Sequence, residues 1–477
     1  KGDLEMKKKL LGALSASLMM SLLLVGCSGS NDATTTKPEG ETSEQTPTQE
    51  ETTSTDEKQE VLKVAVFEGG YGKVFWEEVA KRFEADYPDV TVELTASPKI
   101  GDVIRPQLAA GNAPDFIYFA STNESGVAQA LIKDKKLADL SDVFSQPAPG
   151  ESTPIKDKML PGFLDNKLTA PYGDGTVYLA PLYYNVTGLW YNSALFAEKG
   201  WEAPNTWDEF FALGDAAASE GLSLFTYQGM YPGYNESIVW PAIAGAAGAE
   251  AVENIFSYAD GAWEDENVVK ALEIFQQIAE GDYLLKGTVA MNHTQAQTEH
   301  LKGSALFLPN GNWYEDEMKD AIQEGWEWGF MTSPVFNEGD TRYVATGIEE
   351  MYIPSDAANV ELAKEFMRYL YKDEIVALNA ELNHAVVPIE GAVEMAKEYV
   401  PASNYSSFKI FDESDVLPIM VGFEVATNTE INMKNEVFQP ISSIMNKELT
   451  ASDWAANLEV ASDKVRKIGR ASCRERV

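Results

Sequence analysis

The sequence predicts an α/β fold in which a hinge strand connects two lobes. Over residues 61–119, strand-like segments alternate with segments of helical periodicity, which is the pattern of a doubly wound α/β unit. Residues 177–192 then form a long extended stretch, rich in β-branched and aromatic side chains. Pro181 cannot donate a ladder hydrogen bond and Gly188 adds a flexible point, so we interpret this stretch as a strand that leaves one lobe and enters the other. An ordinary edge strand is the alternative.

The N-terminal segment has the features of a bacterial lipoprotein signal peptide. A basic stretch, 6–9, precedes an apolar run, 10–26, and residues 24–27 match the cleavage box of signal peptidase II. The run is short for a membrane-spanning helix, and its far side is not basic. We expect residues 6–27 to be the signal peptide, with a lipid on Cys27; an uncleaved anchor with an incidental cysteine is the alternative.

Residues 28–60 are predicted to be a disordered acidic tether. They hold thirteen Ser or Thr, nine acidic residues, two lysines and no aromatic residue. Such a composition buries too little apolar surface to offset the entropy of ordering the chain, and its charges repel one another. A lipid on Cys27 followed by this tether places the folded part outside the membrane and away from its surface.

Composition limits the partners of the folded part. The formal net charge of −38 argues against nucleic acid or anionic lipid as a partner, because both would be repelled. The two cysteines, Cys27 and Cys473, both lie in end segments, so we expect no disulfide within a domain. Residues 468–477 are basic and are similar to the in-frame translation of a sequencing adapter, so we expect them to be an artefactual tail.

The folded part can be divided into elements in order. Predicted strands are 62–67, 90–94, 115–119 and 303–308, and predicted helices are 74–86, 103–110, 193–199, 359–371 and 374–382. Thr206 and Glu209 have the spacing of a capping box at the start of another helix. Residues 329–335 are predicted to cross between the lobes a second time. In doubly wound sheets ligands bind beyond the carboxyl ends of the strands, which here means the loops 68–72 and 120–123.

Several of these segments together resemble one family. They are residues 108–115, 188–192, 204–209 and 303–313, and the pair 373–374 with Pro388. In this order, and with the cleavage box, they resemble the family 1 carbohydrate-binding proteins of bacterial ABC importers, which include maltose-binding protein. The resemblance covers about 61–467 and is greatest to the N-acetylglucosamine- or chitobiose-binding lipoproteins.

The resemblance implies a periplasmic-binding-protein-like fold, with two α/β lobes joined by crossing hinge strands. Lobe one would comprise 61–182 with 336–384, and lobe two 185–335 with 385–467. It also implies a monomer without enzymatic activity or cofactor, anchored to the outer face of the cell membrane only by its lipid. Such a protein captures a sugar in the cleft between the lobes and delivers it to the permease subunits of the importer.

A sugar site needs aromatic rings for the apolar faces of the ligand, and amides or carboxylates for its hydroxyls. The maltose-binding relatives carry charged residues after the third strand, where this chain has Thr122 and Asn123, so a neutral, amide-rich site is expected. Either tryptophan among the candidates could instead belong to a core. The candidate binding residues are Glu68, Tyr71, Phe119, Asn123, Asn185, Trp240, Asn310 and Trp313.

Two other classes of function remain open at the sequence level. A secreted glycoside hydrolase needs two carboxylates at a fixed separation, and Glu349 with Glu350 is one available pair. We expect that pair to be solvated, unless one of its carboxylates reaches the cleft. A binding protein for a non-sugar solute is the other class. The three histidines, His293, His300 and His384, lack the spacing of metal ligands, so no dedicated transition-metal site is expected, and a Ca²⁺ ion on a surface loop remains open.

Overall fold

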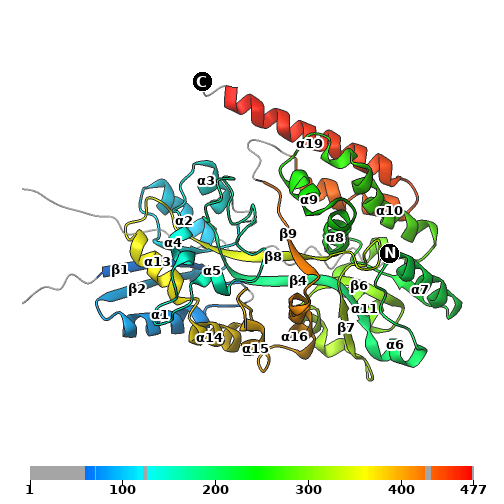
Figure 1. Ribbon diagram of the computed structural model, residues 1–477, viewed down its shortest axis with the longest axis horizontal. Coiled ribbons are helices and arrows are strands. Elements are labelled where there is room, and N and C mark those ends of the chain that lie inside the picture. Colours follow the sequence, from blue (N-terminus) through cyan, green and yellow to red (C-terminus); the bar gives the residue numbers. More distant parts are fainter. Residues whose placement is uncertain (1–59, 70, 122–125, 425–430, 475–477) are drawn as a thin grey trace, which may run out of the picture. The chain divides into compact units, whose positions relative to one another are not determined.

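The computed structural model describes residues 60–69, 71–121, 126–424 and 431–474, the last six of them by their backbone alone (Figure 1). The predicted signal peptide with Cys27, the predicted tether except its last residue, and Asn123 lie outside the described residues. Among the helices described, none has both the length and the apolar character needed to cross a membrane.

The strands join in one sheet through hydrogen-bonded neighbours. They are β1 (Glu60–Phe67), β2 (Val90–Ser97), β3 (Phe116–Tyr118), β4 (Ala180–Asn192), β5 (Ser223–Phe225), β6 (Ala305–Gly311), β7 (Trp328–Met331), β8 (Arg342–Tyr352) and β9 (Val416–Met420). The order across the sheet is β2-β1-β3-β8-β4-β6-β5, with β7 also beside β4 and β9 also beside β8. β1 pairs in parallel with β2 and β3, as the predicted doubly wound start requires.

Helices cover this sheet along its length. The helices up to residue 256 are α1 (Val74–Asp86), α2 (Ile100–Ala109), α3 (Val127–Lys133), α4 (Ser141–Ser145), α5 (Ile155–Lys158), α6 (Ser193–Lys199), α7 (Trp207–Ser219), η1 (Pro232–Asn235), α8 (Glu236–Ala247) and α9 (Ala249–Phe256). Those that follow are η2 (Ala262–Glu264), α10 (Glu266–Glu280), η3 (Thr288–Ala290), α11 (His293–Leu301), α12 (Tyr314–Met318), η4 (Lys319–Ala321), α13 (Val360–Tyr369), α14 (Asp373–Asn383), α15 (Ala392–Ala396), α16 (Ala402–Phe408), η5 (Lys409–Asp412), α17 (Met433–Phe438), α18 (Ile441–Met445) and α19 (Ala451–Arg474).

Local signals in the sequence fix several helix ends. The predicted capping box is present at α7: the Thr206 hydroxyl accepts from the amide of Glu209, and the Glu209 carboxylate accepts from the amide of Thr206. α6 ends at Gly200, which adopts a left-handed φ of 66°. α6 directly follows β4 and α7 follows α6, so these caps determine where the chain turns once it has left the long strand.

β4 and β8 are the two strands that run through the middle of the sheet (Figure 1). They pair antiparallel from Ala180 opposite Met351 to Val186 opposite Thr346, with an irregularity after Pro181. Beyond this, β4 pairs with β6 and β7. The predicted hinge strand is therefore confirmed. The second crossing at 329–335 was wrong, because β7 pairs there only with the end of β4, and β8 is the strand that accompanies β4.

Two large cores lie on either side of the midpoint of β4. The first core gathers apolar side chains of β1, β3, α1, α13 and α14, and the second core those of α7, α8, α10 and α19. On β4, Tyr184 and Val186 belong to the first core and Leu189 to the second. The strand thus passes from one core to the other at Thr187 and Gly188.

The segment after α14 divides between the two cores. Ala392, Phe408 and Ile410 pack in the first core, whereas Trp454 and Leu458 of α19 pack in the second. C-terminal helices can pack on apolar surface that earlier elements leave exposed. The sequence pattern does not tell on which core they pack. The boundaries assigned to the two lobes stay a prediction.

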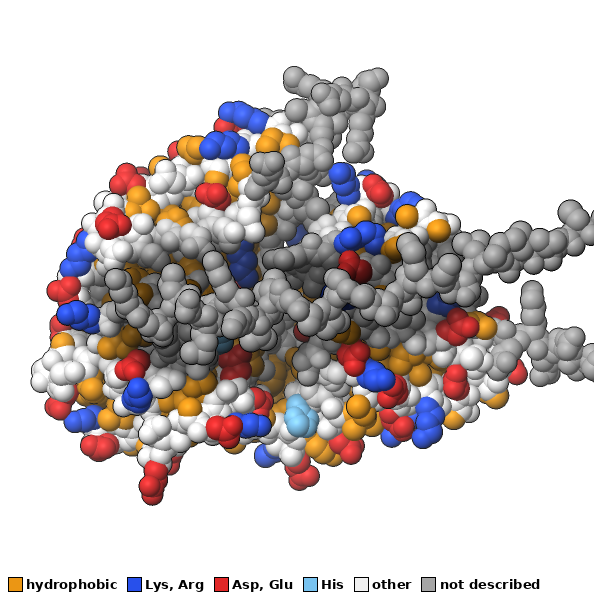
Figure 2. Space-filling model, turned by 180° about the vertical axis from the view of Figure 1, so that it is seen from behind, with side chains coloured by type: hydrophobic (Ala, Val, Ile, Leu, Met, Phe, Trp, Pro, Cys, Tyr) orange, Lys and Arg blue, Asp and Glu red, His pale blue; other side chains and the backbone are white. Residues whose placement is uncertain are grey.

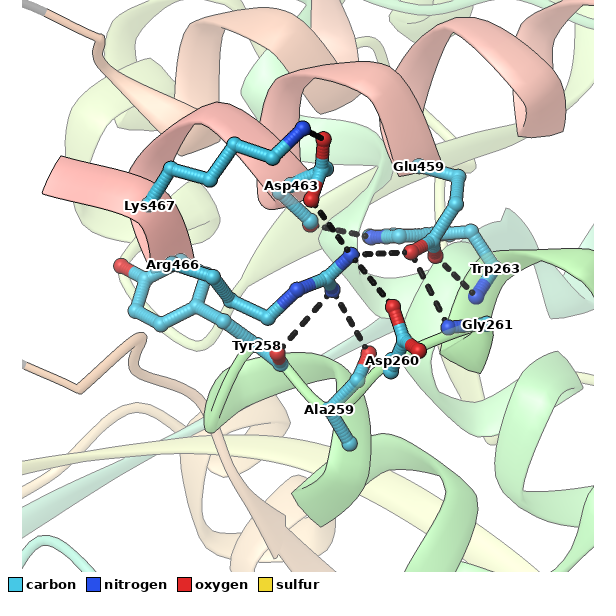
Figure 3. Close-up of polar contacts among 10 residues, drawn as sticks. Tyr258, Ala259, Asp260, Gly261, Trp263, Glu459, Asp463, Arg466 and Lys467 are labelled. Atoms are coloured by element: carbon cyan, nitrogen blue, oxygen red, sulfur yellow. Dashed lines mark hydrogen bonds and ion pairs between the residues drawn. The ribbon is translucent and has the colours of Figure 1, made fainter. Parts of the chain in front are cut away.

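Arg466 fastens the last helix to the loop after α9 (Figure 3). One guanidinium nitrogen donates to the carbonyl oxygens of Tyr258 at 3.1 Å and Ala259 at 3.0 Å. The other lies 2.9 Å from a carboxylate oxygen of Asp260 and 2.8 Å from one of Glu459. Arg466 and Glu459 are largely buried, so the ion pair between them is shielded from screening, whereas Asp260 is exposed. The two bonds to backbone carbonyls tie Arg466 to the turn in which Tyr258 has a left-handed φ of 57°.

The backbone of α19 continues to Arg474, past the end at Lys467 that the change in composition suggested. Whether residues 468–477 contribute to the fold stays a prediction. On the face of the molecule in Figure 2, acidic and basic side chains are interspersed over the described surface. On this face the acidic excess is therefore distributed rather than gathered in one patch.

The sequence context of Gly188 had suggested a flexible point. The structure shows instead that glycine is required there because the chain is closely packed. A Cβ atom there would lie 2.6 Å from the carbonyl oxygen of Met331 and 2.5 Å from the ring of Phe330, both on β7. The backbone of β7 cannot move away as a flexible side chain can. β4 and β7 therefore approach each other this closely only with glycine at position 188.

We expect Gly188→Ala to lower the free energy of unfolding by about 1–3 kcal/mol, because the added methyl group overpacks the contact with β7. Chemical denaturation measures this. Gly245→Ala in α8 is the matched control, since its Cβ would meet only Phe336 at 3.9 Å, and we expect it to be as stable as the wild type or more so. Equal stability of the two variants would show that β7 yields to the methyl group.

Candidate functional site

A cavity of about 860 Å³ opens where the crossing strands meet the helices of the second core. Its wall combines residues that follow β3, the middle of β4 and β8, the first half of α8 and the turn after β6. The lining includes Ser121, Asn185, Glu236, Trp240, Tyr258, Trp313, Gly347, Glu349 and Phe423. A concave site with aromatic rings and a few polar groups is the usual form of a small-molecule site.

Asn185 lies on β4 and reaches across to β8. Its side-chain oxygen accepts from the amide of Gly347 at 3.0 Å. A Cβ atom at Gly347 would lie 2.9 Å from the amide group of Asn185, so glycine makes room for this side chain. The hydrogen bond fixes the amide at the wall of the cavity, and its nitrogen can donate to a ligand oxygen.

Trp313 follows β6 in a tight turn and is half-buried. Its ring lies directly over Gly311, where a Cβ atom would come within 2.1 Å of the ring carbons. The ring is thus held in one orientation with part of its surface in the cavity, as a stacking surface for a ligand requires.

Of two adjacent carboxylates on β8, Glu349 is half-buried and Glu350 is buried, contrary to the solvated pair expected from the sequence. Glu349 lines the cavity and accepts a hydrogen bond from the hydroxyl of Tyr118. Burial raises the pKa of Glu349, and the bond from Tyr118 opposes that shift. Glu350 is 0% exposed; its two oxygens accept from the amide and the hydroxyl of Ser121, at 2.9 and 2.6 Å. Burial raises the pKa of Glu350 to about 7.

The remaining candidates lie in different surroundings. The ring of Tyr71 packs edge-on against Tyr183 at 5.0 Å, and burial, followed by the charge of Glu349, raises the pKa of its phenol. Phe119 is 3% exposed and packs against Phe67 in a small core beside the first. These two residues and Glu68 are not among those that line the cavity.

Trp240 and Asn310 are both buried. Trp240 is 1% exposed and packs against Phe256 and Phe423, so it is a core residue whose edge also reaches the cavity. Asn310, also 1% exposed, lines a smaller pocket together with Trp313. Of the eight candidates, the structure therefore brings Asn185, Trp240 and Trp313 into one cavity.

Sequence reasoning missed part of the wall. Tyr258 and Phe423 line the cavity with their rings stacked at 5.7 Å between centroids. They are far apart in the chain. Tyr258 follows a helix, α9, and Phe423 follows β9, a strand that the sequence analysis did not predict. Among the residues with described positions, no three His, Cys, Asp or Glu side chains gather as a metal site would require.

Comparison with known proteins identifies the family. Residues 78–402, more than half of the chain, match the family of bacterial extracellular solute-binding proteins. The chain belongs to this family. This extracellular solute-binding protein therefore functions outside the cytoplasm.

One named relative covers nearly the whole chain, and a second covers about two thirds of it. The diacetylchitobiose-binding protein NgcE of Streptomyces coelicolor is 24% identical over 475 residues, 98% of this chain and 97% of that protein. The multiple sugar-binding protein of Streptococcus mutans is 22% identical over 324 residues, 66% of this chain and 72% of that one. Both are named as binding proteins and not as enzymes.

A solved structure shows the same fold. The apo form of RafE from Streptococcus pneumoniae superimposes with a TM-score of 0.67 at 17% identity, covering 86% of this chain and 98% of RafE. The periplasmic-binding-protein-like fold and the family predicted from the sequence are confirmed.

The burial of Glu350 predicts a specific pH dependence. Its pKa is about 7 in the folded state against an ordinary value of 4.5, so the folded protein holds the proton more tightly and loses stability as pH rises from about 4.5 to 7. Glu349 contributes in the same direction. His300, whose pKa is lowered to about 4 by burial, contributes in the opposite direction.

We therefore expect Glu350→Gln to gain stability relative to the wild type as pH rises, by up to roughly 3 kcal/mol near pH 7.5. Urea denaturation at pH 4.5, 5.5 and 7.5 measures the difference in free energy of unfolding between the variant and the wild type. Both proteins contain His300, so its contribution cancels from this difference. Glu93→Gln, at an exposed position of β2, is the control and should leave the profile unchanged. A profile for Glu350→Gln parallel to that of the wild type would contradict the burial of a protonated carboxyl.

Proposed function

We propose that this solute-binding protein captures a carbohydrate in the main cavity and delivers it to the permease subunits of an ABC importer. N-acetylglucosamine or a short oligosaccharide is the proposed ligand. The observation that carries the proposal is the composition of the cavity wall, which combines the ring of Trp313 with polar groups of Asn185 and Glu349. The apolar face of a sugar ring can stack on Trp313, and its hydroxyls can hydrogen-bond to Asn185 and Glu349.

The names of the relatives support this ligand class. One is a diacetylchitobiose-binding protein and another a multiple sugar-binding protein, so both bind sugars by name. The uncharged, half-buried amide of Asn185 suits an uncharged ligand. We propose that the protein acts as a monomer, uses no cofactor and releases its ligand unchanged.

Closure of two lobes about the crossing strands is part of the proposal. The lobes would be 61–182 with 336–384, and 185–335 with 385–467; the packing of Phe408 in the first core supports extending lobe one toward β9. Movement would be concentrated where β4 passes between the cores, at Thr187 and Gly188. A sugar that contacts both lobes favours the closed state, because it binds that state more tightly.

We expect a mono- and oligosaccharide panel to raise the melting temperature of the wild-type protein for at least one sugar, which should be recovered intact. Trp313→Ala should weaken binding of that sugar about tenfold, because stacking on the ring removes apolar area worth on the order of 1–2 kcal/mol from water. Isothermal titration calorimetry measures the affinity.

The matched control is Trp201→Ala, since Trp201 is also half-buried but lies outside the cavity lining. It should leave the affinity unchanged. If Trp313→Ala instead keeps its affinity and loses much of its stability, Trp313 is a core residue. If no sugar binds, the proposal fails.

The anchor is a further part of the proposal. Residues 24–27 match a lipoprotein cleavage box, so we propose that Cys27 carries the lipid. In a Gram-positive host, Cys27→Ser should move the protein from the membrane fraction to the medium or leave an uncleaved precursor, which electrophoresis distinguishes by size. A variant of mature size that remains as membrane-bound as the wild type would exclude the lipid as the anchor.

A further inference from the structure

A second pocket of about 310 Å³ adjoins the main cavity. The two share four lining residues, Glu236, Trp313, Lys434 and Phe438. We propose that the second pocket holds a further sugar unit of an oligosaccharide whose other unit lies in the main cavity. The inference rests on the proposed function and specifies its ligand as a chain of two or more units.

The sizes of the two spaces suit this division. A volume of about 310 Å³ is at the lower end of small-molecule sites, which span roughly 300–1,000 Å³, so it accommodates one ring and not a chain. The main cavity, at about 860 Å³, leaves room for the rest of the ligand. Because Trp313 belongs to both walls, its ring can contact units on either side of a glycosidic bond.

Asn310 supplies the polar group that a sugar in the second pocket needs. It lines the pocket, is 1% exposed, and its side-chain oxygen accepts from the amide of Gly311 at 2.9 Å. Its side-chain nitrogen is buried without a hydrogen-bond partner. A buried donor left unpaired is costly, and a sugar hydroxyl or an acetamido oxygen would accept from it.

The mouth of the pocket is apolar and exposed. Met230 and Tyr231 line it and are 57% and 50% exposed, which is unusual for such large apolar side chains. They lie just before η1, whose first residue, Pro232, also lines the pocket. The C–H face of a sugar ring, or the methyl group of an acetamido substituent, would cover this surface.

Two of the four residues that line both spaces form an ion pair. Lys434 of α17 lies with its ammonium nitrogen 3.5 Å from a carboxylate oxygen of Glu236, at the start of α8. A glycosidic linkage that passes from one pocket to the other carries an ether oxygen and neighbouring hydroxyls past this pair. These groups can hydrogen-bond to the ammonium and the carboxylate respectively.

Gly233→Leu tests the proposal by filling the second pocket alone. Gly233 lines only this pocket, has no left-handed φ, and a Cβ there would meet only Lys434 at 3.6 Å, which is ordinary contact. Affinities are measured by calorimetry for three pairs of sugars: N-acetylglucosamine with diacetylchitobiose, glucose with maltose, and galactose with raffinose. Gly245→Leu, outside both linings, is the control.

We expect the wild type to bind one oligosaccharide at least about tenfold more tightly than its monosaccharide. Gly233→Leu should remove that advantage while changing monosaccharide affinity by less than about twofold, and Tyr231→Ala, at an exposed position, should reduce the same advantage. Gly245→Leu should match the wild type.

Other outcomes overturn the proposal. If Gly233→Leu keeps the oligosaccharide advantage, or weakens both members of a pair equally, the second pocket is not a sugar site. If the wild type binds a monosaccharide as tightly as the oligosaccharide, the inference fails and the proposed function stands. If none of the six sugars binds the wild type, the proposed function fails and the inference fails with it.

Discussion

The pairing of β4 with β8 is the constraint on which the other features depend. Two strands that pass between separate cores must keep their hydrogen bonds while the side chains around them change. Near the change of core, side chains supplement the ladder. Asn185 accepts from the amide of Gly347, and the hydroxyl of Thr187 donates to the carbonyl of Ala345 at 2.7 Å. The cavity lies along this reinforced segment, so its wall is also the connection between the cores.

Much of the fold could be predicted because local signals determine it. The alternation of strands and helices from β1 to β3, the extended character of β4 and the Thr206 cap of α7 all depend on neighbours in sequence. The second connecting strand was missed for a physical reason. β8 carries Glu349 and Glu350 within an otherwise apolar and β-branched run, and two adjacent carboxylates indicate a solvent-facing loop unless their buried partners are known.

The site was predictable only where backbone geometry exposes a side chain. Trp313 follows a strand and a glycine turn, Asn185 lies at the middle of the long strand, and both line the cavity. Phe119 also follows a strand, yet it fills the space beside Phe67, and the sequence does not tell which side of a strand end is filled. Tyr258 reaches the cavity because Arg466, far away in sequence, holds its loop. Such long-range packing has no local signature.

The placement of the tryptophans gives the cavity an optical property. Trp76, Trp190, Trp263 and Trp454 are fully buried and are not among the residues that line the cavity, so a bound molecule would not touch them. Trp313 is half-buried with one face in the cavity, and Trp240 reaches it by an edge. Indole emission depends on the polarity around the ring. A molecule that displaces solvent from Trp313 would therefore shift the fluorescence emission of only the few tryptophans that line the cavity, against the emission of those that do not. The intrinsic fluorescence of the protein would thus report whether the cavity is occupied.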